Sequence, residues 1–366
     1  MAIVTTPYIP TVITVHLGAP SQSAANVTVS FADYIKNVAS SEIYPTWEPA
    51  AIRANVLAQI SFALNRVYTQ FYRSRGYDFD ITSSTAYDQK FIPDRTIYDS
   101  ISAVVDEVFD SYIRRRGFVE PLAAKFCNGT TVTCDGLSQW GSQRLAQQGL
   151  DSMAILRRYY GDDIELVVNA PIQQPRDSYP GTPLRRGDYG PEVLVVQTMV
   201  NRIAKDYPAI PVIWPTAAVF DGNTQRSVQA FQRIFGLTPD GIVGKATWYK
   251  MVSLYNAVNE LAELVSEGQR FTQVNFRYPG VVAQGSRGES VRALQYMLAV
   301  VGEFYQILDP VQVDGVFGES TAAAVRAFQR AAGLAQDGVA GEQTWVQLYR
   351  TFAGVEREIA QRATGA

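Results

Sequence analysis

An internal repeat is the strongest constraint on how this 366-residue chain can fold. Phe231 and Phe328 occupy equivalent positions 97 residues apart, and Gly187 and Gly285 occupy equivalent positions 98 residues apart. The other matched positions keep almost the same offset along the whole of each copy. A constant offset of this kind is typical of a duplicated structural unit. The sequence therefore predicts two copies of one module in the second half of the chain.

Each copy has the pattern of three short helices. Apolar residues recur at three- and four-residue steps, as on the buried face of a helix, and in the first copy these are Val193, Val196, Val200, Ile203, Val228, Phe231 and Phe235. A glycine then ends the second helix and an Asp-Gly pair makes a tight turn, at Gly236 and Asp240-Gly241, and again at Gly333 and Asp337-Gly338. Trp248 and Trp345 follow, where a large aromatic side chain is expected to complete a small core.

These motifs resemble the bacterial peptidoglycan-binding-like domain. The shared pattern is G-x-x-G-x-x-V-x-x-x-Q, then A-F-Q-R-x-x-G-L, then D-G-x-x-G-x-x-T-W, and it covers about 184–252 and 283–350. The second copy also has the Asp314–Gly318 turn of the family, whereas the first has Ala217–Gly222 there, so we expect its second helix to begin differently. The resemblance implies affinity for wall glycan or stem peptide, although many members act only as rigid spacers.

Composition along the chain suggests where the domains end. A segment with four prolines precedes the first module and predicts a stiff, extended connector. Apolar spacing in 253–267 predicts a continuation of the third helix of the first module. We therefore expect an N-terminal domain at 1–169, a linker at 170–183, module 1 at 184–267, a linker at 268–282 and module 2 at 283–366.

The N-terminal domain has the pattern of a mixed α+β fold. The predicted elements are strands at Val12–Leu17 and Asn26–Phe31, a short helix at 32–41, a long helix capped by Thr46 with Pro49 in its first turn and ended by Gly76, a second long helix from Ile97 to Ile113 ended by Gly117, and two short helices within 137–160. The predicted fold class is an α+β N-terminal domain followed by two small all-α three-helix modules.

The order of short motifs within residues 10–168 resembles the stage II sporulation protein D and amidase-enhancer family. The pattern Y-I-x-x-V-x-x-S-E-x-x-x-x-W-x-x-x-A matches Tyr34–Ala51, a segment resembling Asp-x-x-x-x-Asp-Gln matches Ser83–Gln89, and S-Q-[YW]-G and I-L-x-x-Y-Y match 138–141 and 155–160. The resemblance implies that Glu42 is the catalytic acid of a lytic transglycosylase. It also implies a substrate-binding set of Trp47, Gln89, Ser138, Gln139, Trp140 and Tyr159.

A single carboxyl group is sufficient for such a reaction. A protonated acid gives its proton to the glycosidic oxygen while an oxocarbenium-like centre develops on the sugar. In a transglycosylase the sugar's own 6-hydroxyl attacks that centre, so no second carboxylate has to activate water. The sequence departs from the family at Ile60, which stands where the family has an active-site arginine. Active glycan cleavage and a binding or structural use of the domain are therefore both open.

Few residues are available for metal or nucleophilic chemistry. His16 is the only histidine, which excludes a multi-histidine metal site, and its alternating strand-like surroundings predict a structural role. Cys127 and Cys134 are the only cysteines, so a four-cysteine zinc site is also excluded. They flank an Asn-Gly pair typical of a hairpin turn, and a disulfide, two free thiols and a metal contact all remain open for them. We expect no metal site and no cofactor.

Charge and hydropathy exclude further classes of partner. The formal net charge is −3 and no cationic run is present, so neither a nucleic acid nor a polybasic membrane contact is expected. No apolar stretch approaches the roughly 20 residues that span a bilayer. The segment Met1–Pro7 lacks the basic and apolar regions of a secretory signal, so we expect no signal peptide.

These observations lead to two hypotheses for function. The first is a bacterial cell-wall protein that binds peptidoglycan glycan strands through its tandem modules and cleaves them with a lytic transglycosylase domain. The alternative is a non-catalytic wall-docking or structural component of a spore, a surface filament or a phage-tail-like particle. Either protein is expected at the cell wall, on the spore or on an extracellular particle, by an export route that the sequence does not identify. The sequence does not define an oligomeric state.

Overall fold

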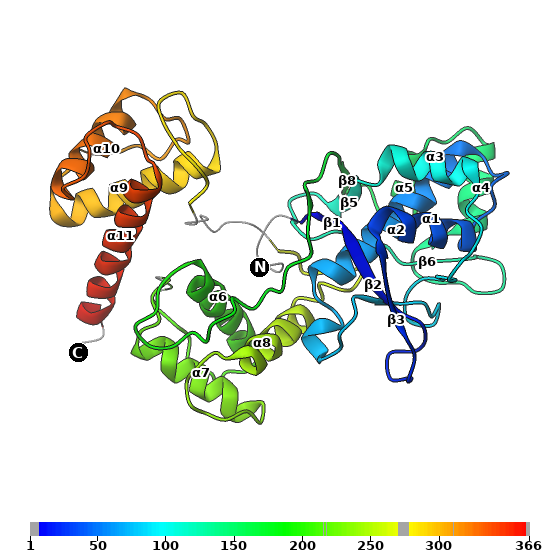
Figure 1. The fold of residues 1–366 in the computed structure, drawn as a ribbon, viewed down its shortest axis with the longest axis horizontal. Coiled ribbons are helices and arrows are strands. Elements are labelled where there is room, and N and C mark those ends of the chain that lie inside the picture. Colours follow the sequence, from blue (N-terminus) through cyan, green and yellow to red (C-terminus); the bar gives the residue numbers. More distant parts are fainter. Residues whose placement is uncertain (1–6, 215, 217, 270–277, 310, 364–366) are drawn as a thin grey trace. The chain divides into compact units, whose positions relative to one another are not determined.

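The computed structural model describes residues 7–363 apart from 215, 217, 270–277 and 310. The chain divides into two compact units, one of Met1–Gly181 with Trp248–Phe271 and one of Thr182–Thr247 with Thr272–Ala366. A mixed α/β N-terminal region is followed by helical modules (Figure 1), which confirms the predicted fold class. The signal-peptide prediction concerns residues of which 1–6 lie outside the described part. Most of the predicted linker at 268–282 also lies outside it.

In its described residues the first unit contains four small sheets. The predicted strands at its start are confirmed: β2 (Val12–His16) pairs antiparallel with β3 (Asn26–Ser30) and parallel with β4 (Ile81–Thr82). The three remaining sheets are two-stranded, and they pair β1 (Ile9–Pro10) with β9 (Ile172–Gln173), β5 (Tyr112–Arg115) with β8 (Ile164–Val167), and β6 (Phe126–Cys127) with β7 (Leu137–Ser138). The segment predicted as the Pro-rich linker thus contributes β9 to this unit.

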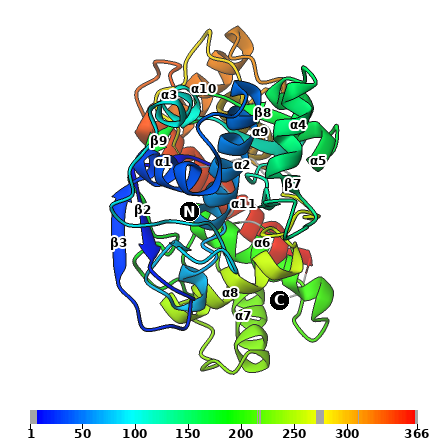
Figure 2. The ribbon, with the colours of Figure 1, turned by 90° about the vertical axis from the view of Figure 1, so that its right-hand side faces the viewer.

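Helix α2 (Pro49–Tyr68) lies at the centre of the first unit. It contacts the four helices around it (Figure 2), namely α1 (Phe31–Glu42), α3 (Asp99–Val108), α4 (Gln139–Gln147) and α5 (Ser152–Tyr160). Because nearly all of α2 is buried, its polar side chains need partners within the protein. The Nδ2 of Asn65 has two such partners, since it donates to the carbonyl oxygens of Pro121 and Leu261 over 2.8 and 2.7 Å.

The ends of α2 differ from the prediction. The helix begins at Pro49 with Glu48 as its N-cap residue, so Thr46 does not cap it. It ends at Tyr68, and Gly76, at φ +90°, instead ends the short 3-10 helix η1 (Arg73–Arg75). Proline at the first helical position leaves no N–H of its own unpaired and has a φ already suited to a helix, which favours a helix that begins at Pro49.

The second predicted long helix is also shorter than expected. Helix α3 ends at Val108, and the residues predicted as its last turn form strand β5. Tyr112 and Ile113 pair with Val167 and Leu166 of β8, more than 50 residues away in the sequence. Aromatic and β-branched side chains suit a strand as well as a helix face, and this distant partner decides between the two.

His16 and the two cysteines have structural roles. His16 is buried and stacks on Phe79 with ring centroids 4.6 Å apart, while its Nδ1 lies 2.7 Å from the Asn26 side-chain oxygen. This confirms the structural role predicted for the histidine. Cys127 and Cys134 form a disulfide across 6.2 Å between their Cα atoms, which decides among the three alternatives left by the sequence.

Helix α8 (Lys245–Val258) ends nine residues before the predicted end of the helix at 267. Leu261 donates its N–H to the carbonyl of Asn256, and the chain turns away at Glu260, which has a φ of +52°. Residues 259–269 then pack on the N-terminal domain within the first unit. Their contacts there involve Asn65, Arg115, Glu120 and Lys125. These contacts stabilise the change of chain direction after Val258 more than one further turn of helix would.

The modules contain the three helices predicted for each copy. They are α6 (Pro191–Asp206), α7 (Gly222–Ile234) and α8 in the first, and α9 (Glu289–Tyr305), α10 (Glu319–Ala331) and α11 (Glu342–Ala363) in the second. Gly236 and Gly333 have φ values of +70° and +68°, which confirms the predicted helix ends. The starts of the second helices differ as expected, because Asp221 caps α7 through the N–H of Thr224, whereas Gly318 stands at that position of α10.

Buried glutamines hold the turns of both modules in the same way. In the first module, Gln232 accepts from the N–H of Gly241 and donates to Asp240 Oδ1 and to the carbonyl of Ile242, over 2.8 to 3.0 Å. Gln329 makes the equivalent three hydrogen bonds with Asp337, Gly338 and Val339 in the second module. The repeated glutamines therefore define the fold of the module, because every polar atom of the amide is used internally.

Candidate functional site

Glu42 is the last residue of α1, and two separate segments contact its carboxylate. Oε1 accepts the backbone N–H of Lys90 over 2.9 Å, and Oε2 accepts Nε2 of Gln139 over 3.3 Å. The side chain is half-buried and Gln139 is buried. Two predicted site residues that lie 97 positions apart are thus in direct contact.

Three aromatic side chains gather within the same region of the first unit. Trp47 and Trp140 have ring centroids 5.0 Å apart, and Tyr44 contacts both rings at 5.7 and 5.6 Å. Trp47 is buried, whereas Tyr44 and Trp140 are 55% and 37% exposed. Tyr44 follows Glu42 by two residues, and Trp140 follows Gln139 directly, so this aromatic cluster lies beside the carboxylate. An exposed face of aromatic rings next to a carboxylate can support an apolar ring face while the carboxylate meets a polar atom.

Ser138 and Tyr159 meet at Gly141 in the first turn of α4. Ser138 is the N-cap of this helix, and its Oγ accepts the N–H of Gly141 over 3.0 Å. A Cβ atom added at Gly141 would lie 2.0 Å from the Tyr159 hydroxyl and 2.8 Å from Ser138 Oγ. Only glycine therefore permits this close approach, and the serine hydroxyl serves here as a helix cap.

The disulfide-bonded loop helps to place this start of α4. Cys127 pairs with Ser138 in the parallel β6–β7 sheet, and Trp140 donates its N–H to the carbonyl of Asn128 over 3.2 Å. Gly129, at φ +75°, passes so close that an added Cβ would lie 1.8 Å from Ser138 Oγ. The loop therefore fixes the position of the segment that carries Gln139 and Trp140.

Gln89 occupies a different position from the other predicted contacts. It is fully buried, accepts from the Tyr34 hydroxyl over 2.9 Å and donates to the carbonyl of Gln59 over 3.0 Å. Burial raises the pKa of Tyr34 well above its usual range, with Asp88 and Glu42 adding to the effect, so the phenol stays protonated as a donor. Gln89 immediately precedes Lys90, whose N–H meets Glu42. In this structure Gln89 therefore supports the carboxylate indirectly.

Two further hydrogen bonds attach α4 to the central helix. Asn55 of α2 donates to Ser142 Oγ over 2.7 Å, and the N–H of Glu48 donates to Gln143 Oε1 over 2.9 Å. Both are buried or partly buried, so the distance between α2 and α4 is closely defined. Ile60, at the position where the resembled family has an arginine, is fully buried in the hydrophobic core. Its side chain has no exposed surface to offer a ligand.

Tyr44 and Lys90 contact residues of the candidate site although the predicted site residues do not include them. Tyr44 had a signal, because it is a large aromatic residue only two positions after Glu42. Lys90 had none, because it contributes a backbone N–H, which any residue other than proline can provide. Within the described residues, no group of three or more His, Cys, Asp or Glu side chains could hold a metal ion.

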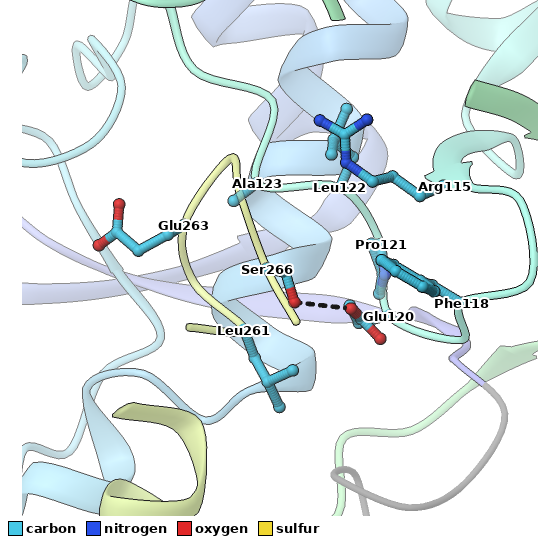
Figure 3. Close-up of a pocket in the computed structure, with 9 residues that line it drawn as sticks. All are labelled: Arg115, Phe118, Glu120, Pro121, Leu122, Ala123, Leu261, Glu263 and Ser266. Carbon is cyan, nitrogen blue, oxygen red and sulfur yellow. Dashed lines mark hydrogen bonds between the residues drawn. The ribbon is translucent and has the colours of Figure 1, made fainter. Parts of the chain in front are cut away.

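A small pocket lies elsewhere in the first unit, between the N-terminal domain and the segment after α8 (Figure 3). Glu120 is buried beside it, accepting Ser266 Oγ over 2.9 Å and the N–H of Gln269 over 2.9 Å. Burial raises the pKa of Glu120, and the two donors partly oppose that shift. The carboxylate thus holds residues 266–269 against the domain, which is a structural function.

No helix in the described ranges is both long and apolar enough to cross a membrane. Comparison with known families gives a match in each copy of the repeat: residues 189–251 and 287–348 match the family described as "Putative peptidoglycan binding domain". These two ranges lie within the two copies that the sequence defined, and they include the whole of α6, α7, α9 and α10.

Similar proteins share only part of their length with this chain. N-acetylmuramoyl-L-alanine amidase CwlM of Mycobacterium tuberculosis is 37% identical over 131 residues, which is 36% of this chain and 27% of that protein. The zinc D-Ala-D-Ala carboxypeptidase of Streptomyces albus G is 42% identical over 76 residues, or 20% of this chain and 28% of that protein. The chain thus spans just over a quarter of the length of these curated relatives.

Among solved structures, the SleB N-terminal domain is 36% identical and covers 20% of this chain and 96% of that one, with a TM-score of 0.18. The resemblance of residues 10–168 to the stage II sporulation protein D family stays a prediction. For the second half of the chain the family match and the repeated helices agree. The chain carries two tandem domains of the peptidoglycan-binding family.

Proposed function

We propose that this protein binds bacterial peptidoglycan and associates with the cell wall. The observation that carries the proposal is the tandem pair of family matches at 189–251 and 287–348. Two binding modules on one chain increase residence on a polymer, because the second module binds at a high effective concentration once the first is bound. The similar proteins, an N-acetylmuramoyl-L-alanine amidase and a zinc D-Ala-D-Ala carboxypeptidase, support the same polymer.

A sedimentation experiment tests this proposal. The full chain is incubated with purified sacculi and centrifuged, and the bound fraction is measured over a range of sacculus concentrations. We expect the protein in the pellet with intact sacculi. Complete recovery of folded protein in the supernatant would contradict the proposal, and it would favour the alternative in which the modules act as spacers in a larger particle. Sacculi stripped of their stem peptides then show whether glycan alone is sufficient.

A second candidate function is glycan cleavage by the N-terminal domain. It is favoured by the contact between Glu42 and Gln139 beside the partly exposed Tyr44 and Trp140. In this mechanism, protonated Glu42 donates its proton to the glycosidic oxygen as the bond to the anomeric carbon breaks. The 6-hydroxyl of the same sugar then attacks that carbon and returns a proton to the Glu42 carboxylate. The product is a 1,6-anhydro sugar, and the acid is regenerated without water.

The roles of the surrounding residues follow from their contacts. Gln139 orients the carboxylate by donating to Oε2, and the Lys90 N–H holds Oε1. Tyr44 and Trp140 offer exposed ring surface for a pyranose. Incubating the protein with sacculi and examining the soluble products by mass spectrometry tests this function. Anhydro-sugar fragments would support it, and their absence would leave the domain a binding or structural role at the same wall.

A further inference from the structure

The loop between α6 and α7 of the first module presents an unusual side chain. Trp214 is 73% exposed, whereas Trp47, Trp248 and Trp345 are buried and Trp140 is 37% exposed. Val212, two residues earlier, is 66% exposed. Between them Ile213 is fully buried, so the backbone alternates and the two exposed side chains share one face. The loop therefore displays an apolar surface with an indole at its end.

This loop is held in place at Pro211 and at Ile213, next to the two exposed side chains. Asn201 of α6 donates from Nδ2 to the carbonyl of Ile213 over 2.9 Å and accepts the N–H of Ile213 over 2.8 Å. Ser227 of α7 donates to the carbonyl of Pro211 over 2.7 Å. Ile210 and Ile213 are both buried. The backbone just before the indole is thus fixed by hydrogen bonds and by buried side chains, which lowers the entropy that binding has to overcome.

The second module lacks this feature. Residues 306–318 separate its first and second helices, two fewer than the residues 207–221 of the first module, and no tryptophan or other aromatic residue lies between Gln306 and Val316. Val311, in that segment, packs partly buried against the core of the second module. The two copies therefore share their glutamine hydrogen bonds but differ at this loop, which shows that the module fold does not require Trp214.

Polar side chains contact the backbone that carries the indole. Asn223 donates from Nδ2 to the carbonyl of Trp214 over 3.4 Å, and exposed Arg226 donates to the side-chain oxygen of Asn223. Two exposed apolar side chains are far too small a surface for a stable protein–protein interface, which buries roughly 1,200–2,000 Å² in total. One flat aromatic face with polar side chains bonded to its own backbone instead fits one sugar ring, with the apolar face of the sugar on the indole.

We propose that Trp214 is a sugar-stacking residue through which the first module holds an N-acetylhexosamine ring of the glycan strand. This inference rests on the proposed peptidoglycan binding and adds the part of the polymer that the first module contacts. It also makes the tandem modules unequal, since the second has no matching aromatic residue. Arg226 and Asn223 form the polar rim of this subsite.

The test uses the full chain and two independent readouts. The first is sedimentation with intact and with peptide-stripped sacculi, for wild type, Trp214→Ala and Trp214→Phe. We expect binding about tenfold weaker for Trp214→Ala, as for the truncation of an aromatic anchor, with substantial recovery in Trp214→Phe. Val313→Ala is the matched control, because Val313 is 47% exposed in the corresponding region of the second module, and it should bind like wild type.

The second readout is tryptophan fluorescence with a soluble N-acetylglucosamine oligomer, measured in a Trp140→Phe background that leaves Trp214 as the one substantially exposed indole of the chain. A spectral shift on addition of the oligomer supports the stacking contact. Such a shift in a protein that fails to sediment with sacculi would keep this inference and contradict the proposed function.

Three results would overturn the inference. One is unchanged binding of Trp214→Ala to sacculi that wild type does bind. Another is a loss of binding confined to intact sacculi, which would assign the residue to stem peptide. The last is a change of oligomeric state in Trp214→Ala by light scattering, which would assign it to contacts between copies. A urea unfolding curve confirms that Trp214→Ala is folded, as expected for so exposed a side chain.

Discussion

Gln139 donates a hydrogen bond from Nε2 to Oε2 of Glu42, over 3.3 Å, and so joins the start of α4 to the end of α1. The amide has two possible functions. It can orient the carboxylate for a bound glycan, or it can simply join two helices. The two functions differ in what happens when each partner is replaced, and the first two predictions separate them.

Glu42→Gln is expected to abolish glycan cleavage while leaving the fold intact. The amide keeps the shape of the carboxyl group but has no proton of suitable acidity to deliver. General acid groups typically contribute about 10²–10⁴ in rate, so anhydro-sugar release should fall by at least about a hundredfold. Mass spectrometry of sacculus digests measures the loss. An active wild type whose Glu42→Gln variant keeps its full rate would show that another residue is the acid.

Gln139→Ala is expected to weaken cleavage less than Glu42→Gln does. It removes a positioning hydrogen bond and leaves the acid in place, so the effect should appear as a changed pH profile as well as a lower rate. Gln143→Ala is a matched control, because Gln143 lies in the same helix as Gln139. It accepts the N–H of Glu48 and does not contact Glu42 in the structure. A Gln143→Ala rate as low as that of Gln139→Ala would indicate that both residues act only through the position of α4.

Gly141→Ala is expected to destabilise the first unit, although alanine normally favours a helix. The new methyl would lie 2.0 Å from the Tyr159 hydroxyl, and such overpacking typically costs about 1–3 kcal/mol. Gly354→Ala in α11 provides the control, because among the described residues no atom beyond the neighbouring helix backbone lies within 4 Å of its added Cβ. That variant should gain up to about 1 kcal/mol from helix propensity. Urea unfolding measures both, and a gain in Gly141→Ala would contradict the close approach.

The two repeat tryptophans are expected to stabilise different units. Trp248→Ala and Trp345→Ala should each cost about 3–5 kcal/mol, because both side chains are almost fully buried. Trp248 also donates from Nε1 to Ser178 Oγ over 2.8 Å, and both residues belong to the first unit. Its replacement should therefore lower the unfolding transition of the first unit, and Trp345→Ala that of the second. Calorimetry resolves the two, and a shift of the same transition by both variants would contradict this assignment.

The stability of the first unit is expected to depend on pH through Glu120. Burial raises the pKa of this carboxyl above its ordinary 4.5 in the folded state, so the folded protein holds the proton more strongly than the unfolded chain. Its contribution to stability is therefore fully present below pH 4.5 and is lost as the pH rises through the raised value. The free energy of unfolding of wild type, relative to Glu120→Gln, should fall over that range.

Asp337→Asn is the control of opposite sign. The N–H of Val339, and then the amide of Gln329, lower the pKa of Asp337 below 3.8. Its contribution is therefore present above that value and is lost as the pH falls through the lowered one.

For Glu120, the contradicting result is a difference in the free energy of unfolding between wild type and Glu120→Gln that stays constant from about pH 4 to about pH 7. It would show that the Glu120 carboxylate is not desolvated as the structure indicates.

The repeat was predictable from sequence because its determinants are close together in the chain. Gln232 reaches Asp240 and Gly241 within nine residues, and the second copy repeats this with Gln329. The single histidine was assigned correctly for a similar reason, since alternation around His16 defines its strand. Within the candidate site the structure shows contacts of Glu42 with Gln139 and of Trp47 with Trp140, and the role of these residues in binding a substrate stays a prediction.

Contacts between distant segments decided the features that the sequence alone did not predict. Tyr112 forms a strand because β8 pairs with it, and residues 259–269 leave the helix because Asn65, Glu120 and Lys125 bind them. The contact of Glu42 with the Lys90 N–H joins two segments 48 positions apart. Local periodicity determines which residues can form a helix, since it depends on neighbours three and four residues away. Whether the helix forms, and what its end touches, depends on the burial and hydrogen bonds supplied by the rest of the chain.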